Sequence, residues 1–367
     1  MSVATAATLP VAPLTGTLVD RFGARRVVIL AQLSQGAGFV AYLFVGSTPA
    51  LVPSALLVAV GQRMFWSALF TLLAEISAPG ELDRWYGLAG ATQNAGFGAG
   101  GLLSGLAVAA GGPAGYYLVV AANAASFVLA AGLILFRVPH PERATADREG
   151  KGAYSAVLRD RPFLALTASN AAFALCNVML VVGVPVFAVE ILGTPAWVPG
   201  VLLASNTALV AGTQTIVVRI VEPHRRTRAL GLAGLLWCGW CIGTALALSV
   251  PASLLVPYLL LTTVVFTLAE VIHAPTSNAL AAAASPEALR GRYLATFQFS
   301  WATASFVAPG LFTLLLSVGP ALPWATVAFL ALSAGSWLLW LEGRLPPGAA
   351  RGASELVLLP AVRSDER

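Results

Sequence analysis

Two ionisable side chains lie deep inside one apolar stretch, residues 254–283, and their types suit proton exchange. Glu270 stands near the middle of the stretch and His273 follows at i+3, which places both on one face of a helix. A carboxyl group in an apolar setting resists ionisation, and an imidazole titrates near neutral pH. Pro275 then weakens the helix and frees carbonyl groups that need partners, often along a cavity. Glu270 is therefore the first candidate for proton binding; the alternative is an internal hydrogen bond that joins two helices.

Arg63 is a third charge at similar depth, about ten residues into the apolar stretch 53–76. A charge at the middle of a bilayer costs at least about 2.5 kcal/mol, so its presence there indicates a function. The alternative is a structural arginine that is paired with a carboxylate or with helix carbonyls. Other acidic residues, Glu75 and Glu190, fall near the ends of their stretches and are expected at the membrane interface.

The composition excludes an ordinary soluble protein. Hydrophobic residues make up 58% of the chain and charged residues 10%, whereas a soluble domain carries about 25% charged residues. The three cysteines all lie in apolar runs and predict no disulfide framework. Cys238 and Cys241 spell C-x-x-C, but inside an apolar helix they are interpreted as two small core residues. The class predicted is an all-α polytopic membrane protein.

Eleven apolar stretches are long enough to span a bilayer, which takes about 20 residues. They are residues 2–19, 27–46, 53–76, 86–110, 115–137, 162–189, 199–221, 229–249, 254–283, 292–317 and 323–342. The charged, apolar-poor segment 138–161 separates five of them from six. We therefore expect an N-terminal helix bundle (1–137), a linker (138–161), a C-terminal bundle (162–342) and a tail (343–367).

Basic residues are distributed very unequally among the connections. Of the 21 Lys and Arg residues, all except Arg63 fall in every second connection, in the tail or at the bordering helix ends. The positive-inside rule makes that side cytoplasmic, with the C-terminus on it, in a plasma membrane. The basic residues cluster at the ends of the spans, and no aromatic residues alternate with them. This pattern excludes nucleic-acid binding.

A polar, basic loop between the first two stretches reads Gly16-Thr-Leu-Val-Asp20-Arg21-Phe-Gly23-Ala-Arg25-Arg26. It resembles the signature loop between the second and third spans of major facilitator superfamily transporters. The glycines are expected to permit the tight turn. The resemblance places Asp20 near the start of span 292–317, where a carboxylate favours the helix N-terminus. A cytoplasmic gate is expected from Gly16, Asp20, Arg21, Gly23, Arg25, Arg26 and Arg84, with Asp20 clasped by Arg25, Arg26 and Arg84.

Two more stretches resemble the same family. Arg63-Met-Phe-Trp66-Ser67 is similar to the arginine motif of the fourth span, which is linked to proton coupling; Trp66 and Ser67 replace the usual Gln and Gly. The stretch Ala269 to Pro275 resembles the tenth span of bacterial drug-efflux members, which often carry a glutamate. The resemblance thus implies proton coupling through Glu270 and Arg63, and His273 is a further candidate because an imidazole titrates near neutral pH.

A glycine-rich stretch, residues 93–105, contains a literal G-x-G-x-x-G. A dinucleotide site needs that pattern between a strand and a helix, so we reject it here. The pairs Gly96/Gly100 and Gly101/Gly105 are instead expected to let helices approach closely. The stretch resembles the fifth-span motif of antiporters, except that Gly101 replaces a proline and Ser104 a glycine.

The chain repeats itself. Residues Pro79 to Tyr86 resemble Pro286 to Tyr293, and Glu222 to Arg228 form a degenerate second copy of the signature loop. Two related halves predict a substrate site between them at mid-membrane. The amide side chains that could line it are Gln93, Asn94, Asn170, Asn177, Asn206, Gln214, Asn278 and Gln298, each of which has helix-to-helix hydrogen bonding as its alternative.

The fold expected is therefore two pseudo-symmetric helix bundles of the major facilitator type, and the function expected is secondary active transport. Proton-coupled efflux of small amphipathic molecules is favoured; an importer or uniporter, or a transport-dead truncated member, is the alternative. The sequence contains no Gly-x-x-x-x-Gly-Lys-Ser/Thr loop, so use of ATP is not expected and a proton gradient would supply energy. No cofactor, metal or enzymatic activity is expected. We expect a monomer in the lipid bilayer. The family has twelve spans, and the missing first one is expected to reflect a late start codon or a truncated gene, unless the protein has eleven.

Overall fold

The computed structural model describes residues 11–78, 81–111, 113–139, 154–346 and 348–351. These residues form helices and no strands. The N-terminal half contains α2 (Val11–Phe22), α3 (Ala24–Tyr42), α4 (Thr48–Ile76), α5 (Leu82–Gly111) and α6 (Pro113–Arg137). The C-terminal half contains α7 (Tyr154–Arg159), α8 (Arg161–Val186), α9 (Val198–Val221), α10 (Arg226–Leu246), α11 (Leu255–Ala284), α12 (Arg290–Val318) and α13 (Leu322–Leu341). Short helical turns are η1 (Phe187–Ile191), η2 (Ala247–Ser249), η3 (Ala252–Leu254), η4 (Glu287–Leu289) and η5 (Glu342–Arg344).

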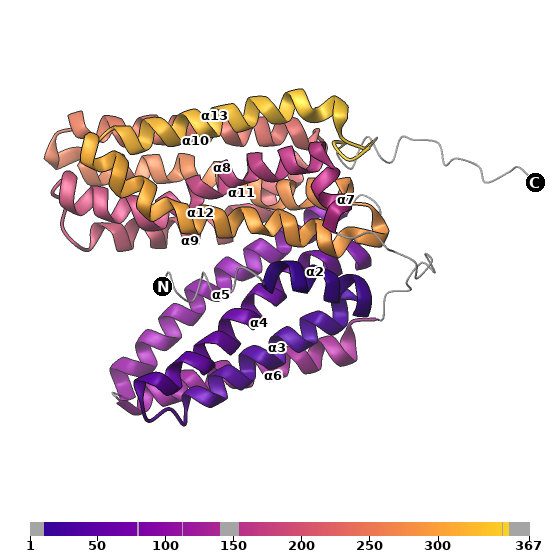
Figure 1. The fold of residues 1–367 in the computed structure, drawn as a ribbon. Helices are drawn as coiled ribbons and strands as arrows, with labels where there is room; N and C mark the ends of the chain where they lie inside the picture. Colours follow the sequence, from indigo (N-terminus) through magenta and orange to yellow (C-terminus); the bar gives the residue numbers. More distant parts are fainter. Residues whose placement is uncertain (1–10, 79–80, 112, 140–153, 347, 352–367) are drawn as a thin grey trace, which may run out of the picture.

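The helices form two bundles, α2–α6 and α8–α13, as Figure 1 shows. In the first bundle α3 packs between α4 and α6, and in the second α10 packs between α11 and α13. The bundles meet where α2 crosses α12 and where α5 lies against α9 and α11. Away from these crossings the two bundles diverge (Figure 1). This confirms the predicted fold class, a polytopic all-α protein built from two pseudo-symmetric bundles.

Eight of the described helices, α4, α6 and α8–α13, are long and apolar enough to cross a membrane. Three more lie beside them in the first bundle. The described part of α2 is short at 12 residues, α3 begins with two arginines, and α5 carries charge in its first turn and amides farther on. Polar residues lower the mean hydropathy of such helices without preventing them from spanning inside a bundle. About eleven spans is therefore a consistent description of a multi-pass membrane protein.

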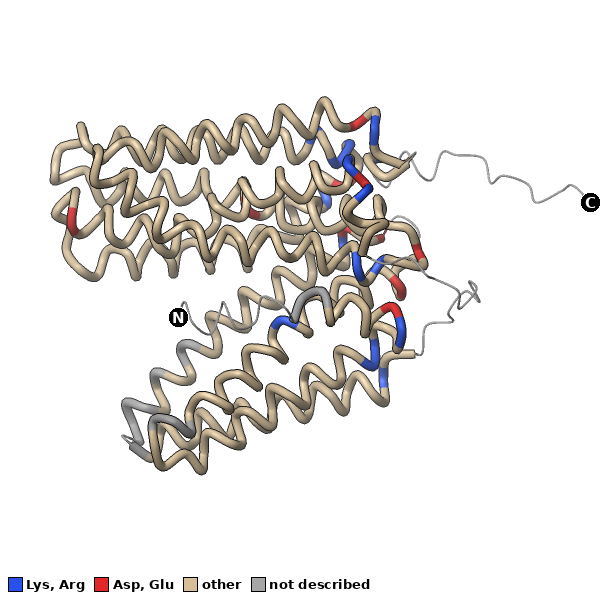
Figure 2. The backbone as a smooth tube through the Cα atoms, in the orientation of Figure 1, with Lys and Arg blue, Asp and Glu red and all other residues tan. Residues whose placement is uncertain are grey.

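Charged residues gather at one end of both bundles, the same end at which the bundles converge (Figure 2). We call this the charged end. Helices α5, α10 and α12 begin there, while α2, α4 and α9 end there. Because helix starts from one bundle face helix ends from the other, the charged end is where dipoles and side-chain charges of both bundles can pair.

Aromatic side chains fill the core of the second bundle. Trp237, Trp240 and Trp324 are almost fully buried, and the ring of Trp240 lies 5.6 Å from that of Trp324 and 4.8 Å from that of Phe266. Cys176 and Cys241 are buried free thiols beside this core, and Cys238 is half-buried. The second bundle is thus a firmly packed body on which functional side chains can be held.

Candidate functional site

The first contact between the bundles joins the end of α2 to the start of α12. The Oδ1 atom of Asp20 accepts a hydrogen bond of 2.8 Å from the backbone N–H of Gly291, and Oδ2 lies 3.5 Å from Nη1 of Arg292. A carboxylate at the start of a helix satisfies an unpaired N–H and meets the positive end of the helix dipole. The structure places Asp20 where the sequence predicted; its role in gating stays a prediction.

Two glycines allow this crossing to be so close. A Cβ atom at Gly16 would lie 2.9 Å from the Cα of Arg292, and one at Gly291 would lie 2.7 Å from Cγ1 of Val19. Real Cβ atoms do not come so near to other atoms, so only glycine fits at either position. The predicted turn role of Gly16 is wrong, because Gly16 lies within α2. The turn belongs to Gly23, whose φ of 91° is left-handed.

The short helix α7 covers this crossing. It packs against α12, and the hydroxyl of its Tyr154 is hydrogen-bonded to the side chain of Thr17. Burial, and next the charge of Asp20, raises the pKa of Tyr154 to about 12. The hydroxyl therefore stays protonated at neutral pH and adds no negative charge beside Asp20.

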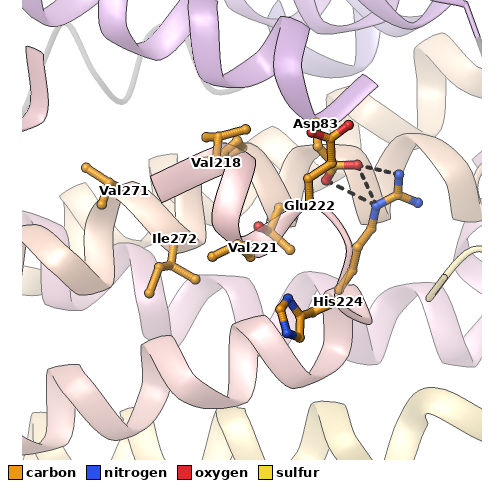
Figure 3. A pocket seen from close by; sticks show the side chains of 10 residues that line it. Asp83, Val218, Val221, Glu222, His224, Val271 and Ile272 are labelled. Carbon is orange, nitrogen blue, oxygen red and sulfur yellow. Dashed lines mark hydrogen bonds and ion pairs between the residues drawn. The ribbon is translucent and has the colours of Figure 1, made fainter. Parts of the chain in front are cut away.

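The second contact is a buried ion pair between the start of α5 and the start of α10. Nη2 of Arg226 lies 2.6 Å from Oδ2 of Asp83, and Nε lies 3.2 Å from both carboxylate oxygens. The two side chains are only 4% and 7% exposed. Figure 3 shows Asp83 pointing toward the arginine, with Glu222 beside it. Sequence reasoning missed this pair, although the second copy of the signature loop contains Arg226.

Arg84 also joins the bundles, but with a different partner from the one predicted. Its Nε lies 2.8 Å from Oε2 of Glu222, and its side chain is 61% exposed while Glu222 is buried. Arg84 was expected to clasp Asp20. That expectation is wrong because Arg84 belongs to the α5 crossing and Asp20 to the α2 crossing.

Arginines of the first loop contact groups of their own bundle. The guanidinium of Arg25 donates hydrogen bonds to the carbonyl oxygens of Leu135 and Val138, at 2.5 and 2.9 Å, near the end of α6. Arg21 lies 5.3 Å over the ring of Phe22, and Arg26 is exposed. Arg26 has no contact with Asp20 in the described part of the chain, so its predicted part in the clasp is wrong, whereas the part of Arg25 stays a prediction. Arg25 satisfies carbonyls that the end of α6 leaves unpaired.

A small pocket lies beside the ion pair of Asp83 and Arg226 (Figure 3). Asp83, Glu222 and Arg226 form its polar side, and Val271 and Ile272 its apolar side. Its free space is about that of a single water molecule. This pocket is too small for an organic substrate.

Glu270 lies half-buried in α11 and contacts α9. Its Oε2 accepts a hydrogen bond of 2.7 Å from Nδ2 of Asn206, which also lies 3.0 Å from Oγ1 of Thr267. One carboxylate oxygen is thus held by an amide that can equally donate to a neutral carboxyl. The arrangement can support a group that changes its protonation without losing its place.

His273 has different neighbours and is fully buried. Its Nε2 lies 2.9 Å from Oδ1 of Asn170, whose Nδ2 donates to Oγ of Ser300 at 2.6 Å. The rings of Phe173 and Trp237 pack on the imidazole at 5.1 and 4.9 Å. The structure therefore does not bring Glu270 and His273 together as one site. For His273, the alternative of a hydrogen bond between helices fits better than proton exchange.

Arg63 is half-buried within α4. It makes no hydrogen bond and no ion pair with any other residue that the structure describes. Neither partner of the structural alternative, a carboxylate or a helix carbonyl, is found for it in that part of the chain. Arg63 therefore remains a functional candidate on the first bundle.

Most of the predicted cavity amides are buried between helices in this conformation. Asn170, Asn177, Asn206, Gln214 and Asn278 are all less than 10% exposed. Nε2 of Gln298 donates to Oδ1 of Asn278 at 3.0 Å, and Asn177 and Asn94 bond carbonyls one turn back in their own helices. The bond of Gln298 to Asn278 joins two helices, as the alternative predicted, whereas the bonds of Asn177 and Asn94 stay within one helix; a cavity role for these residues stays a prediction. Gln93 and Asn94, on α5, are only half-buried.

The glycines of α5 also act at other positions than predicted. A Cβ at Gly96 or Gly100 would meet no atom within 4 Å, so the predicted close approach there is wrong. The close approach occurs nearer the charged end. A Cβ at Gly87 would lie 2.7 Å from Cγ2 of Val218, and one at Gly90 would lie 2.9 Å from Nε2 of Gln214. The surroundings of Gly101 and Gly105 lie outside the described part.

Known proteins of similar sequence and structure agree with this architecture. The multidrug resistance protein MdtH of Cronobacter sakazakii is 26% identical over 345 residues, which cover 91% of this chain and 82% of that protein. The human organic anion transporter MFSD10 shares the fold with a TM-score of 0.70 at 16% identity, covering 92% of this chain and 82% of MFSD10.

A bacterial homologue of the iron transporter ferroportin, solved in an outward-facing state, gives a TM-score of 0.71 at 17% identity; the match covers 93% of this chain and 89% of that one. The family model of the Major Facilitator Superfamily matches residues 1–239. With two bundles, a matching signature loop and a family match over more than half of its length, this chain belongs to the major facilitator superfamily and is a membrane transporter, not an enzyme.

Proposed function

We propose that this transporter exports small amphipathic molecules from the cell and that proton movement drives the export. The observation that carries the proposal is the arrangement of the bundles: ion pairs join them at the charged end, and they diverge toward the opposite end (Figure 1). Alternating access requires such a closed end, and requires that it can reopen. The similarity to a protein named for multidrug resistance supports amphipathic substrates.

The charged end is the cytoplasmic end in this proposal. Basic residues favour the cytoplasmic side of membrane proteins, and Figure 2 shows that they gather with the acidic ones at this end. The conformation is then the outward-facing one, in a monomer in the plasma membrane with its C-terminus in the cytoplasm. The pairs of Asp20, Asp83 and Glu222 would stabilise this state.

Glu270 is the proposed proton-binding group. Among the described residues of α11 it is the only acidic one, and only one of its oxygens has a hydrogen-bond partner among the residues that the structure describes. Binding a proton would weaken the charge-assisted hydrogen bond from Asn206 without breaking it, so the side chain would keep its place between α11 and α9. Arg63, half-buried on the other bundle, would supply the opposing charge that makes proton release favourable.

A substitution at Glu270 tests the coupling. In proteoliposomes with an imposed pH gradient, Glu270→Gln should lower gradient-driven accumulation of a cationic dye by at least about tenfold, since the amide keeps the hydrogen bonding and removes the proton site. The matched control is Glu190→Gln, because Glu190 is exposed in η1, remote from the charged end.

The same preparations separate the alternatives. Gradient-driven accumulation that survives Glu270→Gln would contradict coupling through this residue. Loss of the gradient effect with unchanged dye counterflow would support coupling and show that the transport path is intact. Counterflow without any gradient effect in the unmodified protein would favour a uniporter.

A further inference from the structure

The chain folds back under the charged end after α13. Leu345, Ala349 and Ala350 are 8%, 3% and 9% exposed, so this segment is packed into the protein. Gly348 has a φ of 88°, which other residues rarely adopt, and reverses the chain. Hydrogen bonds from Ala349 N–H to the carbonyl of Pro346 and from Arg351 N–H to that of Gly348, at 3.0 and 3.1 Å, make it compact. We call the described residues 345–346 and 348–351 the return segment.

The return segment contacts Arg226, the arginine that pairs with Asp83. Nη1 of Arg226 donates a hydrogen bond of 2.9 Å to the carbonyl of Ala349, and its backbone N–H donates one of 2.9 Å to the carbonyl of Ala350. The other edge of the same guanidinium, Nε and Nη2, faces Asp83 of the first bundle. One edge of the Arg226 guanidinium is therefore bound by a carbonyl of its own bundle, and the opposite edge pairs with the carboxylate of Asp83 in the other bundle.

Neighbouring contacts hold the chain directly before the return segment against the start of α10. Glu342, in η5, is hydrogen-bonded by Arg225 and by the hydroxyl of Thr227, both beside Arg226 at the start of α10. These bonds lie within the second bundle, so they can persist when the charged end opens. An arginine side chain has many rotamers and loses much entropy when it is fixed. Carbonyls that fix it in advance reduce the loss that accompanies ion pairing.

We propose that the return segment positions Arg226 for its ion pair with Asp83 and thereby favours the closed charged end. The segment acts through the arginine and has no contact of its own with a substrate. This inference rests on the proposed function only in that the charged end must open during transport.

Two truncations of the full protein test the proposal. One ends at Arg344 and removes the return segment; its control ends at Arg351 and removes only the residues after it. Spin labels on Cys substituted for Trp85 in α5 and for Ile220 in α9, both exposed near the charged end, report the separation of the bundles by double electron–electron resonance. Cys176, Cys238 and Cys241 are replaced by Ser in all variants.

The truncation at Arg344 should lower the ratio of closed to open populations by about tenfold, since a charged hydrogen bond and its pre-orientation are lost. The truncation at Arg351 should match the full chain. Equal ratios in the two truncations would overturn the proposal. If the shorter chain does not fold, Ala349→Leu serves instead, because a leucine cannot fit at this buried position and should displace the segment.

A double-mutant comparison excludes a merely structural effect. If the segment acts through Arg226, its removal should cause no further shift once Asp83→Asn has removed the charge on the partner. An additive shift would contradict the proposal. These populations are measured without substrate or gradient, so failure of the Glu270 experiment with a retained shift would reject proton coupling and leave the return segment's role standing.

Discussion

The two crossings that close the charged end derive from the same internal repeat but use different interactions. At the α2–α12 crossing, the carboxylate of Asp20 meets a helix start, with its main bond to the N–H of Gly291. Where α5 crosses α9 and α11, Asp83 at the start of α5 meets a buried guanidinium, that of Arg226 at the start of α10. One contact thus depends mainly on a backbone dipole and the other on a buried ion pair.

Because of this difference, similar loops can lose different amounts of free energy when one residue is substituted. A backbone N–H is neutral, so loss of its acceptor leaves one unsatisfied donor at a cost of about 1–3 kcal/mol. Loss of one partner from a buried ion pair leaves an uncompensated charge, which costs about 3–5 kcal/mol. We therefore expect the second crossing to be the more sensitive of the two, and three substitutions rank the contacts.

The largest effect is expected from Asp83→Asn. Because Arg226 would remain buried without a countercharge, closure should lose about 3 kcal/mol, more than a hundredfold in the ratio of closed to open populations. The spin-label pair described above measures this ratio. Glu81→Gln is the matched control, since Glu81 is an exposed acid two residues earlier and should leave the ratio unchanged.

A double variant tests whether the unpaired charge of Arg226 causes that loss. When Arg226→Met is added to Asp83→Leu, the buried charge is removed together with its partner, and much of the closed population should return. Open populations that persist in this double variant would show that the pair contributes more than mutual neutralisation. A closed population that is unaffected by Asp83→Asn would remove the basis of the comparison.

Asp20→Asn should have an intermediate effect. The amide oxygen of Asn can still accept the hydrogen bond from Gly291, while the attraction to the helix start and to Arg292, 3.5 Å away, is lost. A loss of about 1 kcal/mol, or roughly fivefold in the population ratio, follows. Asp20→Ala, which also removes the acceptor, should cost more. An effect of Asp20→Asn as large as that of Asp83→Asn would contradict the ranking, and no effect would reject the gate role of Asp20.

The sequence predicted where Asp20 meets the second bundle but did not predict the buried pair of Asp83 and Arg226. Asp20 belongs to a recognisable loop, and the family resemblance placed it near the start of α12. Arg84 was assigned to Asp20 because both lie at the same membrane surface. Spacing along the chain does not say which bundle surface faces which, and Asp83, one residue before Arg84, turned out to hold the buried arginine.

Register across the bundles explains the other errors. The i+3 spacing places Glu270 and His273 near each other on α11, yet a modest rotation around the helix directs one to α9 and the other to α8. Small residues show that α5 can approach a neighbour but not at which turn. The bundles diverge along α5 (Figure 1), so Gly87 and Gly90 meet α9 whereas Gly96 does not.

The smallest effect is expected from Arg84→Gln, and it separates burial from charge as the basis of closure. Arg84 is mostly exposed, and an exposed ion pair is weakened by water and screened by salt. At physiological ionic strength the population ratio should not change measurably, and a small loss should emerge only in low salt. Glu222→Gln should have a larger effect than Arg84→Gln, because Glu222 is the buried member of the pair. If Arg84→Gln instead opened the charged end as strongly as Asp83→Asn, the net charge at the start of α5 would govern closure, and the desolvated contact would not.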